Sequence, residues 1–134
     1  MTLPELESLV RRFEDCTLPR EAWTHRAHLS VAVWYLFHFS RAEATERIRT
    51  GIQRYNASLG NAKGCHETVT LAWVAIVGTF LQQSAADRRV AALASDAAAQ
   101  FGGSDFLLQH FSKELLFSDL ARRTWVDPDL KPLA

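Results

Sequence analysis

The sequence has 134 residues, with 15 Lys and Arg against 15 Asp and Glu, 48% hydrophobic residues, five His and two Cys. This length fits one domain, and the balanced charge excludes the broad positive field of a general nucleic-acid binder as well as an acidic disordered chain. Residues 1–15 mix acids with apolar residues, unlike a signal peptide, and the weakly charged stretch 29–39 is too short to cross a membrane. We therefore expect a cytoplasmic protein that binds neither nucleic acid nor membranes.

Four segments have clear helical periodicity, and no segment alternates as a strand does. The first predicted helix begins at a capping box formed by Thr2 and Glu5 and ends before Pro19. The second runs from about residue 24 to residue 39 and is apolar around most of its circumference. A helix of this kind is expected at the centre of the fold.

The remaining helices follow in quick succession. A second capping box, at Ser40 and Glu43, opens the third helix, and Gly60 ends it. After a short loop, a fourth helix begins near His66, and the alanine-rich stretch 87–100 predicts a fifth. Two short helical pieces and an extended tail complete the chain: 105–111 after Ser104, 113–123 after Ser112, and the tail from about Trp125. The prediction is an all-α fold, a single-domain bundle (1–134) of about five main helices plus short C-terminal helices.

Three histidines stand at the starts of two predicted helices. His25 and His28 are three residues apart, so they lie on one face of the second helix, together with inward apolar residues. His66 begins the fourth helix on the side that also faces inward. If the second and fourth helices are parallel, both starts lie at the same end of the bundle, and the three side chains could meet there.

Three histidines with an open coordination position would suit a catalytic divalent metal such as Zn, Fe, Mn, Ni or Cu. Glu67 follows His66, and neighbouring residues on a helix diverge by about 100°. We therefore expect Glu67 to act as a base, or as an additional ligand only if the helix start bends. The simpler alternative is that buried histidines have satisfied ring nitrogens and that Glu67 complements a helix dipole.

The other candidate side chains have open interpretations. His38 is expected to be structural, and His110 is either a fourth ligand or a surface residue. Cys65 and Cys16 could in principle pair with a histidine as nucleophiles, but most lone cysteines are small buried hydrophobes. They form no disulfide framework, although one bridge is possible. Alternating charges predict a solvated face on the third helix: Arg41, Glu43, Glu46, Arg47, Arg49 and Arg54.

Several segments resemble a family of small uncharacterised bacterial all-helical proteins. The similarity lies in Thr24-His25-Arg26-Ala27-His28, in His66-Glu67-Thr68-Val69-Thr70 and in Ala121-Arg122-Arg123-Thr124-Trp125. It covers nearly the whole chain, but Cys65 stands where the family pattern has Tyr. The resemblance implies that a set of polar residues acts together: His25, His28, His66, Glu67 and Arg122.

Two further residues are candidates for substrate binding. Arg122 either complements the C-terminus of its helix or binds an anionic substrate group, because guanidinium matches carboxylate and phosphate geometry. The Thr70 hydroxyl could hydrogen-bond a histidine or the substrate, or its own helix. Together these residues predict a metal-binding helical bundle, and a metal-dependent hydrolytic or oxidative enzyme acting on a small anionic molecule.

A function of a different class also fits the sequence. The chain could be a metal-free module that binds a small ligand or another protein, with structural histidines in its core. Exposed apolar residues among Trp34, Phe37 and Phe117 would then serve a homodimer interface.

Overall fold

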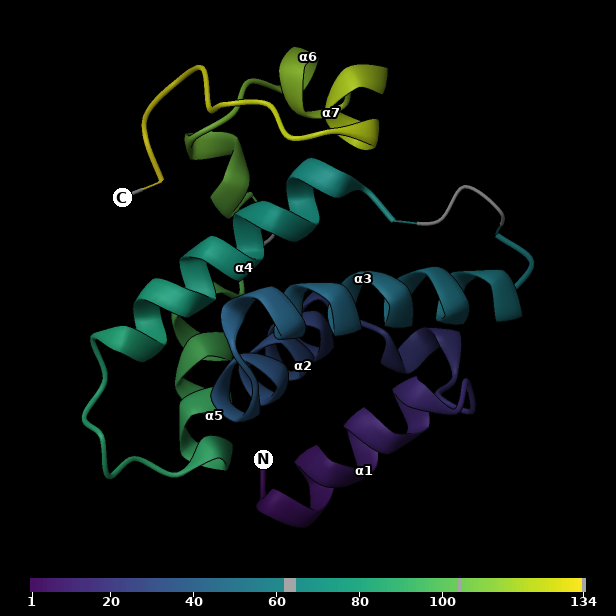
Figure 1. Ribbon diagram of the computed structural model, residues 1–134, viewed down its shortest axis with the longest axis vertical. Coiled ribbons are helices and arrows are strands. Elements are labelled where there is room, and N and C mark those ends of the chain that lie inside the picture. Colours follow the sequence, from purple (N-terminus) through teal and green to yellow (C-terminus); the bar gives the residue numbers. More distant parts are fainter. Residues whose placement is uncertain (62–64, 104, 134) are drawn as a thin grey trace.

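The computed structural model describes residues 1–61, 65–103 and 105–133, and these ranges are helical with no strand. The main helices are α1 (Leu3–Glu14), α2 (His25–His38), α3 (Arg41–Ser58), α4 (Glu67–Gln82) and α5 (Val90–Phe101). The short ones are η1 (Arg20–Ala22), η2 (Phe106–Gln109), α6 (Lys113–Leu116) and α7 (Asp119–Arg123). The predicted all-α bundle of five main helices with short C-terminal helices is confirmed (Figure 1).

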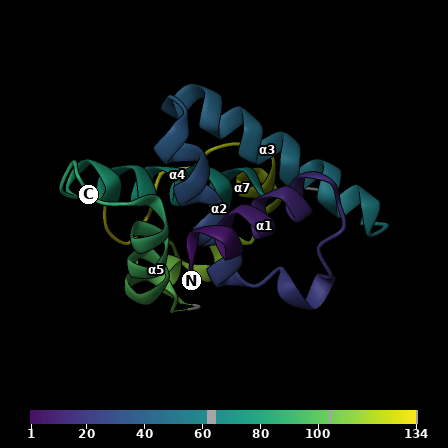
Figure 2. The same ribbon diagram turned by 90° about the horizontal axis from the view of Figure 1, so that it is seen from below.

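Helix α2 is the central element of the bundle, as its apolar circumference predicts. It packs against α1, α3, α4 and α5, and α1 lies across it (Figure 2). Because it has neighbours on every side, residues from all around the helix are buried: Ala27, Leu29, Ser30, Val31, Ala32, Val33 and Tyr35.

The two predicted capping boxes differ in the structure. In the first, Glu5 N donates to Thr2 Oγ1 at 3.2 Å, and Thr2 N donates to Glu5 Oε1 at 3.0 Å, so the box is complete. In the second, Glu43 N donates to Ser40 Oγ at 3.2 Å, but the Glu43 carboxylate pairs with Arg47 at 3.0 Å. An ion pair one turn along α3 therefore takes the place of half of this capping box.

Several predicted boundaries need correction. The predicted helix 113–123 is two helices, because the Ser118 side chain accepts a hydrogen bond from Ala121 N and starts α7 as a separate helix. The fifth helix begins at Val90 rather than near residue 87, and η1 was not predicted. Gly60 ends α3 with a φ of 81°, as expected. Predictions that concern residues 62–64 and Ser104 lie outside the described residues.

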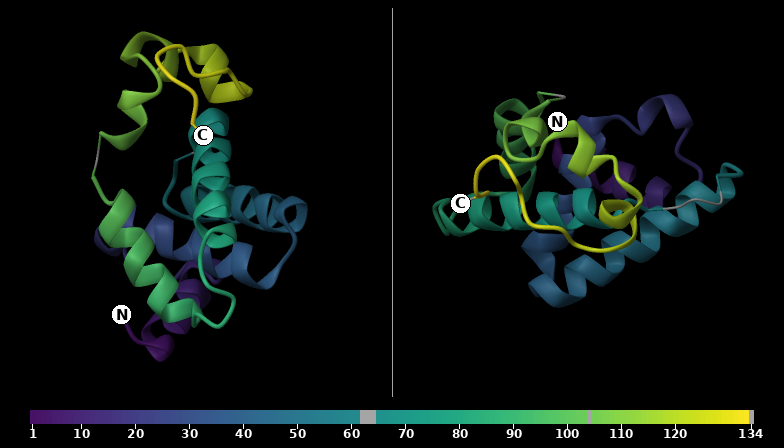
Figure 3. Two further views of the ribbon diagram at one scale, coloured as in Figure 1. Left: turned by 90° about the vertical axis from the view of Figure 1, so that its left-hand side faces the viewer. Right: turned by 90° about the horizontal axis from the view of Figure 1, so that it is seen from above.

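The C-terminal part of the chain folds back over the start of α4. Figures 1 and 3 show α6, α7 and the final segment together at one end of the molecule. Helix α7 packs against α4, so two segments far apart in the sequence lie side by side. This junction positions the pocket described below.

The described residues contain neither a membrane-spanning helix nor a disulfide. Over the described residues, no helix is both long enough and apolar enough to cross a membrane. Cys16 and Cys65 are both free thiols, so the one disulfide that they could form is not present.

Candidate functional site

His25 lies in the first turn of α2, where this helix meets α4 and α5. Its Nε2 donates to the Phe101 carbonyl at 3.0 Å, and its ring centroid lies 4.9 Å from that of Trp73. Because a carbonyl can only accept, Nε2 carries a proton, and in the neutral tautomer that fits this bond the lone pair is on Nδ1. Nδ1 has no hydrogen-bond partner among the described residues.

His28 lies one turn further along α2 and packs on an indole. Its Nδ1 donates to the Thr24 carbonyl at 2.6 Å, and its ring centroid is 3.8 Å from that of Trp23. Burial lowers the pKa of His28, and the nearby His25 lowers it further. The neutral ring therefore keeps its lone pair on Nε2, which has no partner in the part of the chain that the structure describes.

His66 uses both ring nitrogens for structure. It is the N-cap residue of α4, where Nδ1 accepts a hydrogen bond from Val69 N at 3.2 Å. On the other side of the ring, Nε2 donates to the Leu116 carbonyl at 2.7 Å. His66 thus closes the start of α4 and ties it to α6. To bind a metal, this histidine would have to give up one of these two bonds.

These contacts place His66 away from the histidine pair of α2. Trp73, which contacts His25, follows His66 by seven residues, a distance of roughly 10 Å along the helix axis. Helix α2 crosses α4 steeply instead of running parallel to it (Figures 2 and 3), so the two helix starts do not meet. Within the described ranges, no three His, Cys, Asp or Glu side chains are grouped as metal ligands. The three-histidine metal site stays a prediction.

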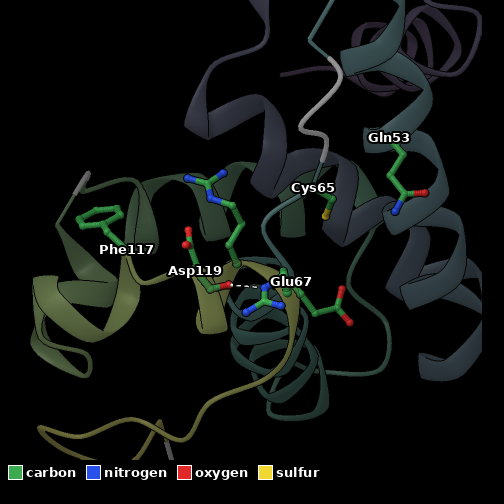
Figure 4. A pocket seen from close by; sticks show the side chains of 7 residues that line it. Gln53, Cys65, Glu67, Phe117 and Asp119 are labelled. Atoms are coloured by element: carbon green, nitrogen blue, oxygen red, sulfur yellow. Dashed lines mark hydrogen bonds between the residues drawn. The ribbon is translucent and has the colours of Figure 1, made fainter.

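A large pocket instead lies where α3, the start of α4 and α7 come together. Its volume is about 720 Å³. Phe117 and Asp119 lie on one side of it, Gln53 and Cys65 lie on the other, and Glu67 lies between them (Figure 4). The pocket brings together two of the residues predicted to act jointly, and it adds others: Glu67 and Arg122, with Gln53, Cys65, Phe117, Asp119 and Arg123.

The Glu67 carboxylate is held by an arginine of α3. Arg49 Nε donates to Oε1 at 2.9 Å and Arg49 Nη2 donates to Oε2 at 2.7 Å, a two-bond contact with both side chains about three-quarters buried. The hydrogen bonds to Glu67 raise the pKa of Arg49. Glu46 also pairs with Arg49. Glu67 is therefore an ion-pair partner in this structure, which is a different role from the predicted base or ligand.

Arg122 is the unpaired cation of the pocket. It lies in the last turn of α7, is exposed, and its guanidinium has no hydrogen bond or ion pair with any described residue. Its neighbour Arg123 donates from Nε to the main-chain oxygen of Asp119 at 3.3 Å, the bond drawn in Figure 4. Arg122 thus lines the pocket with all its donors available.

Cys65, which lines the pocket, contacts Thr70. Cys65 Sγ lies 2.8 Å from Thr70 Oγ1, and burial raises the pKa of the thiol. The thiol therefore stays protonated at neutral pH, which does not favour a nucleophile. Thr70 is buried and lines a separate small chamber with His28, so it is not among the residues that line the large pocket.

The fully buried Thr68 fixes the chain just after α7. Thr68 Oγ1 donates to the Thr124 carbonyl at 2.7 Å and accepts from Val126 N at 3.2 Å. The first turn of α4 therefore holds the segment that follows Arg122 and Arg123. This double contact positions a five-residue helix that is too short to be stable alone.

Two more contacts hold the final segment. His110 is 6% exposed, which corrects the surface alternative, and its Nδ1 donates to the Pro132 carbonyl at 2.9 Å. The same ring nitrogen lies 3.2 Å from the Lys131 carbonyl. Asp129 Oδ1 accepts from Ser112 N at 2.8 Å. His110 therefore holds the final segment against the rest of the fold. His38 is also structural, because its Nδ1 donates to the Trp34 carbonyl of its own helix.

The sequence pattern missed Arg49 as a site residue. Its spacing from Glu43 and Glu46 fits a solvated helix face, and nothing local indicates a partner 18 positions later on another helix. Arginine prefers two-bond contacts with carboxylates, but this preference does not indicate which Asp or Glu of the sequence is the partner of Arg49.

Comparison with protein families, curated proteins and solved structures finds no match for the chain. The resemblance to small bacterial helical proteins therefore stays a prediction. The pocket itself offers a guanidinium without a partner among the described residues, an ion-paired carboxylate and an exposed aromatic ring.

Proposed function

We propose that this protein binds a small anionic molecule in the pocket between α3, α4 and α7, with Arg122 as the group that contacts the anion. The observation that carries the proposal is the guanidinium of Arg122, which lines the pocket without a partner among the described residues. An arginine offers five donors in a planar fork that matches carboxylate and phosphate oxygens.

The charges around Arg122 support an anionic ligand. Glu67 is paired with Arg49, and Asp119 lines the pocket together with two arginines, Arg122 and Arg123. With Glu46 also paired to Arg49, the charges at and beside the pocket balance, but the guanidinium of Arg122 has no partner among the described residues. An anion that enters gains from the charge of Arg122, whereas a cation meets no carboxylate without a nearby arginine.

The pocket dimensions indicate a ligand with an apolar part as well. A volume of about 720 Å³ lies within the range of small-molecule sites, roughly 300–1,000 Å³. Phe117, which is 62% exposed, offers an apolar wall beside the charged groups. A carboxylate or phosphate attached to a ring or a short hydrocarbon fits this combination.

Isothermal titration calorimetry with benzoate and with inorganic phosphate tests the proposal. The wild type is compared with Arg122→Gln and with the control Arg41→Gln, because Arg41 is also exposed and without a described side-chain partner. Loss of one charge-assisted contact should weaken binding of the preferred probe about tenfold or more in Arg122→Gln. The control should bind like the wild type. Equal affinity in Arg122→Gln and wild type would contradict the proposal.

Divalent metal binding is kept as a second candidate function. It is favoured by His25 and His28, which share one helix turn and each have one ring nitrogen without a described partner. Metal content after anaerobic reconstitution with Zn, Fe, Mn, Ni and Cu tests it, with His25→Ala and His66→Ala beside the wild type. Stoichiometric metal lost in both variants would support the three-histidine site, and metal at background in the wild type would reject it.

A further inference from the structure

A small, largely enclosed chamber lies in the middle of the bundle, apart from the anion pocket. Its volume is about 60 Å³, and it lies where α2, α3 and α4 meet. Protein interiors contain few voids larger than a water molecule, so a space of this size among central helices is a distinct feature. Eleven side chains line it: Trp23, His28, Leu29, Val31, Ala32, Ile48, Ile52, Val69, Thr70, Trp73 and Val74.

The lining of the chamber offers little to a water molecule. Seven of the eleven side chains are aliphatic, two are indoles with one N–H each, and His28 and Thr70 are polar. The Thr70 hydroxyl is already in contact with Cys65 Sγ, and Nδ1 of His28 donates to its own helix. A buried water needs about two to four polar partners, whereas the surface of this chamber is almost wholly apolar.

We propose that this chamber is a binding site for a small, neutral, apolar molecule of noble-gas or diatomic size. Its volume is under half of that of an engineered apolar cavity of roughly 150 Å³, which binds benzene or xenon, so benzene is too large for it. A charged molecule would lose its hydration without compensation from the apolar walls. The inference is independent of the anion pocket, because the two lining sets share no residue.

Xenon is the probe that tests this site, since it is a single neutral apolar atom. Methyl signals in ¹H–¹³C spectra of the full chain are followed under increasing xenon pressure. Saturable shifts are expected for methyls that line the chamber and not for other buried methyls. The reporting methyls belong to Leu29, Ile48, Ile52, Val69 and Val74.

A matched pair of substitutions ties the signal to the chamber. Val74→Ile adds one methylene at the chamber wall, whereas Val90→Ile makes the same change at a buried residue of α5 that does not line it. The saturable shifts should be lost in Val74→Ile and retained in Val90→Ile. Ala32→Val provides a second filled variant if Val74→Ile does not fold.

Two results would overturn the inference. One is a wild-type titration in which the lining methyls do not shift saturably, and this outcome depends on no variant. The other is equal xenon affinity in wild type, in Val90→Ile and in a filled variant that is folded.

Discussion

At the scale of single residues, the ion pair between Arg49 and Glu67 gives the pocket its charge balance. Both side chains are about three-quarters buried and joined by two hydrogen bonds, so the pair is less screened than a surface pair. Without Arg49, the Glu67 carboxylate would be an unpaired negative charge in the pocket and would oppose the binding of an anion at Arg122.

The strength of this pair can be measured by a double-mutant cycle with Arg49→Met and Glu67→Gln. We expect a coupling free energy of about 1–2 kcal/mol from urea unfolding, because both charged groups are partly desolvated. The matched control is the exposed pair of Arg47 and Glu43 on the same helix, for which about 0.3–0.5 kcal/mol is expected. Equal coupling in the two cycles would contradict this account of the pair.

Asp129 gives a prediction for pH dependence. Its hydrogen bonds with Ser112 hold the pKa of the carboxyl below its usual value. Since the folded pKa is lowered, the stabilisation is present above the unfolded pKa of about 3.9 and is lost as the pH falls through the folded value.

Urea unfolding of wild type and Asp129→Asn at several pH values tests this. The wild type should be the more stable protein at about pH 6, and its advantage should disappear as the pH falls to about 2. If the difference in unfolding free energy between the two proteins is unchanged across this pH range, the charge of Asp129 does not contribute to stability.

At the scale of elements, α7 depends on α4 for its position. It has five residues, and the contact of Thr68 with Thr124 and Val126 fixes the chain that follows it. The arginines of α7 therefore line the pocket only as long as this contact holds.

The isosteric change Thr68→Val removes the contact and leaves a main-chain N–H and a carbonyl without partners. We expect a loss of about 1–3 kcal/mol of unfolding free energy, together with weaker benzoate binding because α7 is no longer fixed. The control is Thr79→Val on the same helix, because the Thr79 side chain makes no hydrogen bond with any residue in the described ranges. Urea unfolding and calorimetry measure both effects, and a Thr68→Val protein as stable as Thr79→Val would refute the role of this contact.

Helix ends and their capping follow from local sequence, which is why the capping box at Thr2 and the end of α3 at Gly60 could be predicted. The central position of α2 could be predicted from the apolar residues around its circumference. The crossing of α2 over α4 could not, because helix packing angles depend on contacts between distant residues. For the same reason the sequence correctly placed His66 at the start of α4 but did not indicate its bond to Leu116.

At the scale of the whole molecule, the pocket exists because the C-terminal segment returns to the start of α4. Glu67 and Arg122 were predicted to act together, and the structure places both in the lining of one pocket. The three histidines do not line this pocket. His25 and His28 lie in the first turn of α2, and His66 joins the start of α4 to α6. The molecule therefore separates an exposed charged pocket from an apolar interior chamber.

The most direct test of the anion pocket is an NMR titration of ¹⁵N-labelled wild type with benzoate, following arginine Nε–H signals and main-chain amides. Our account predicts saturable shifts of the Arg122 Nε–H signal and of the amides of Cys65, Glu67 and Asp119, with the Arg41 signal unchanged. An Arg122 signal that does not move, or moves in proportion to that of Arg41 without saturation, would contradict it.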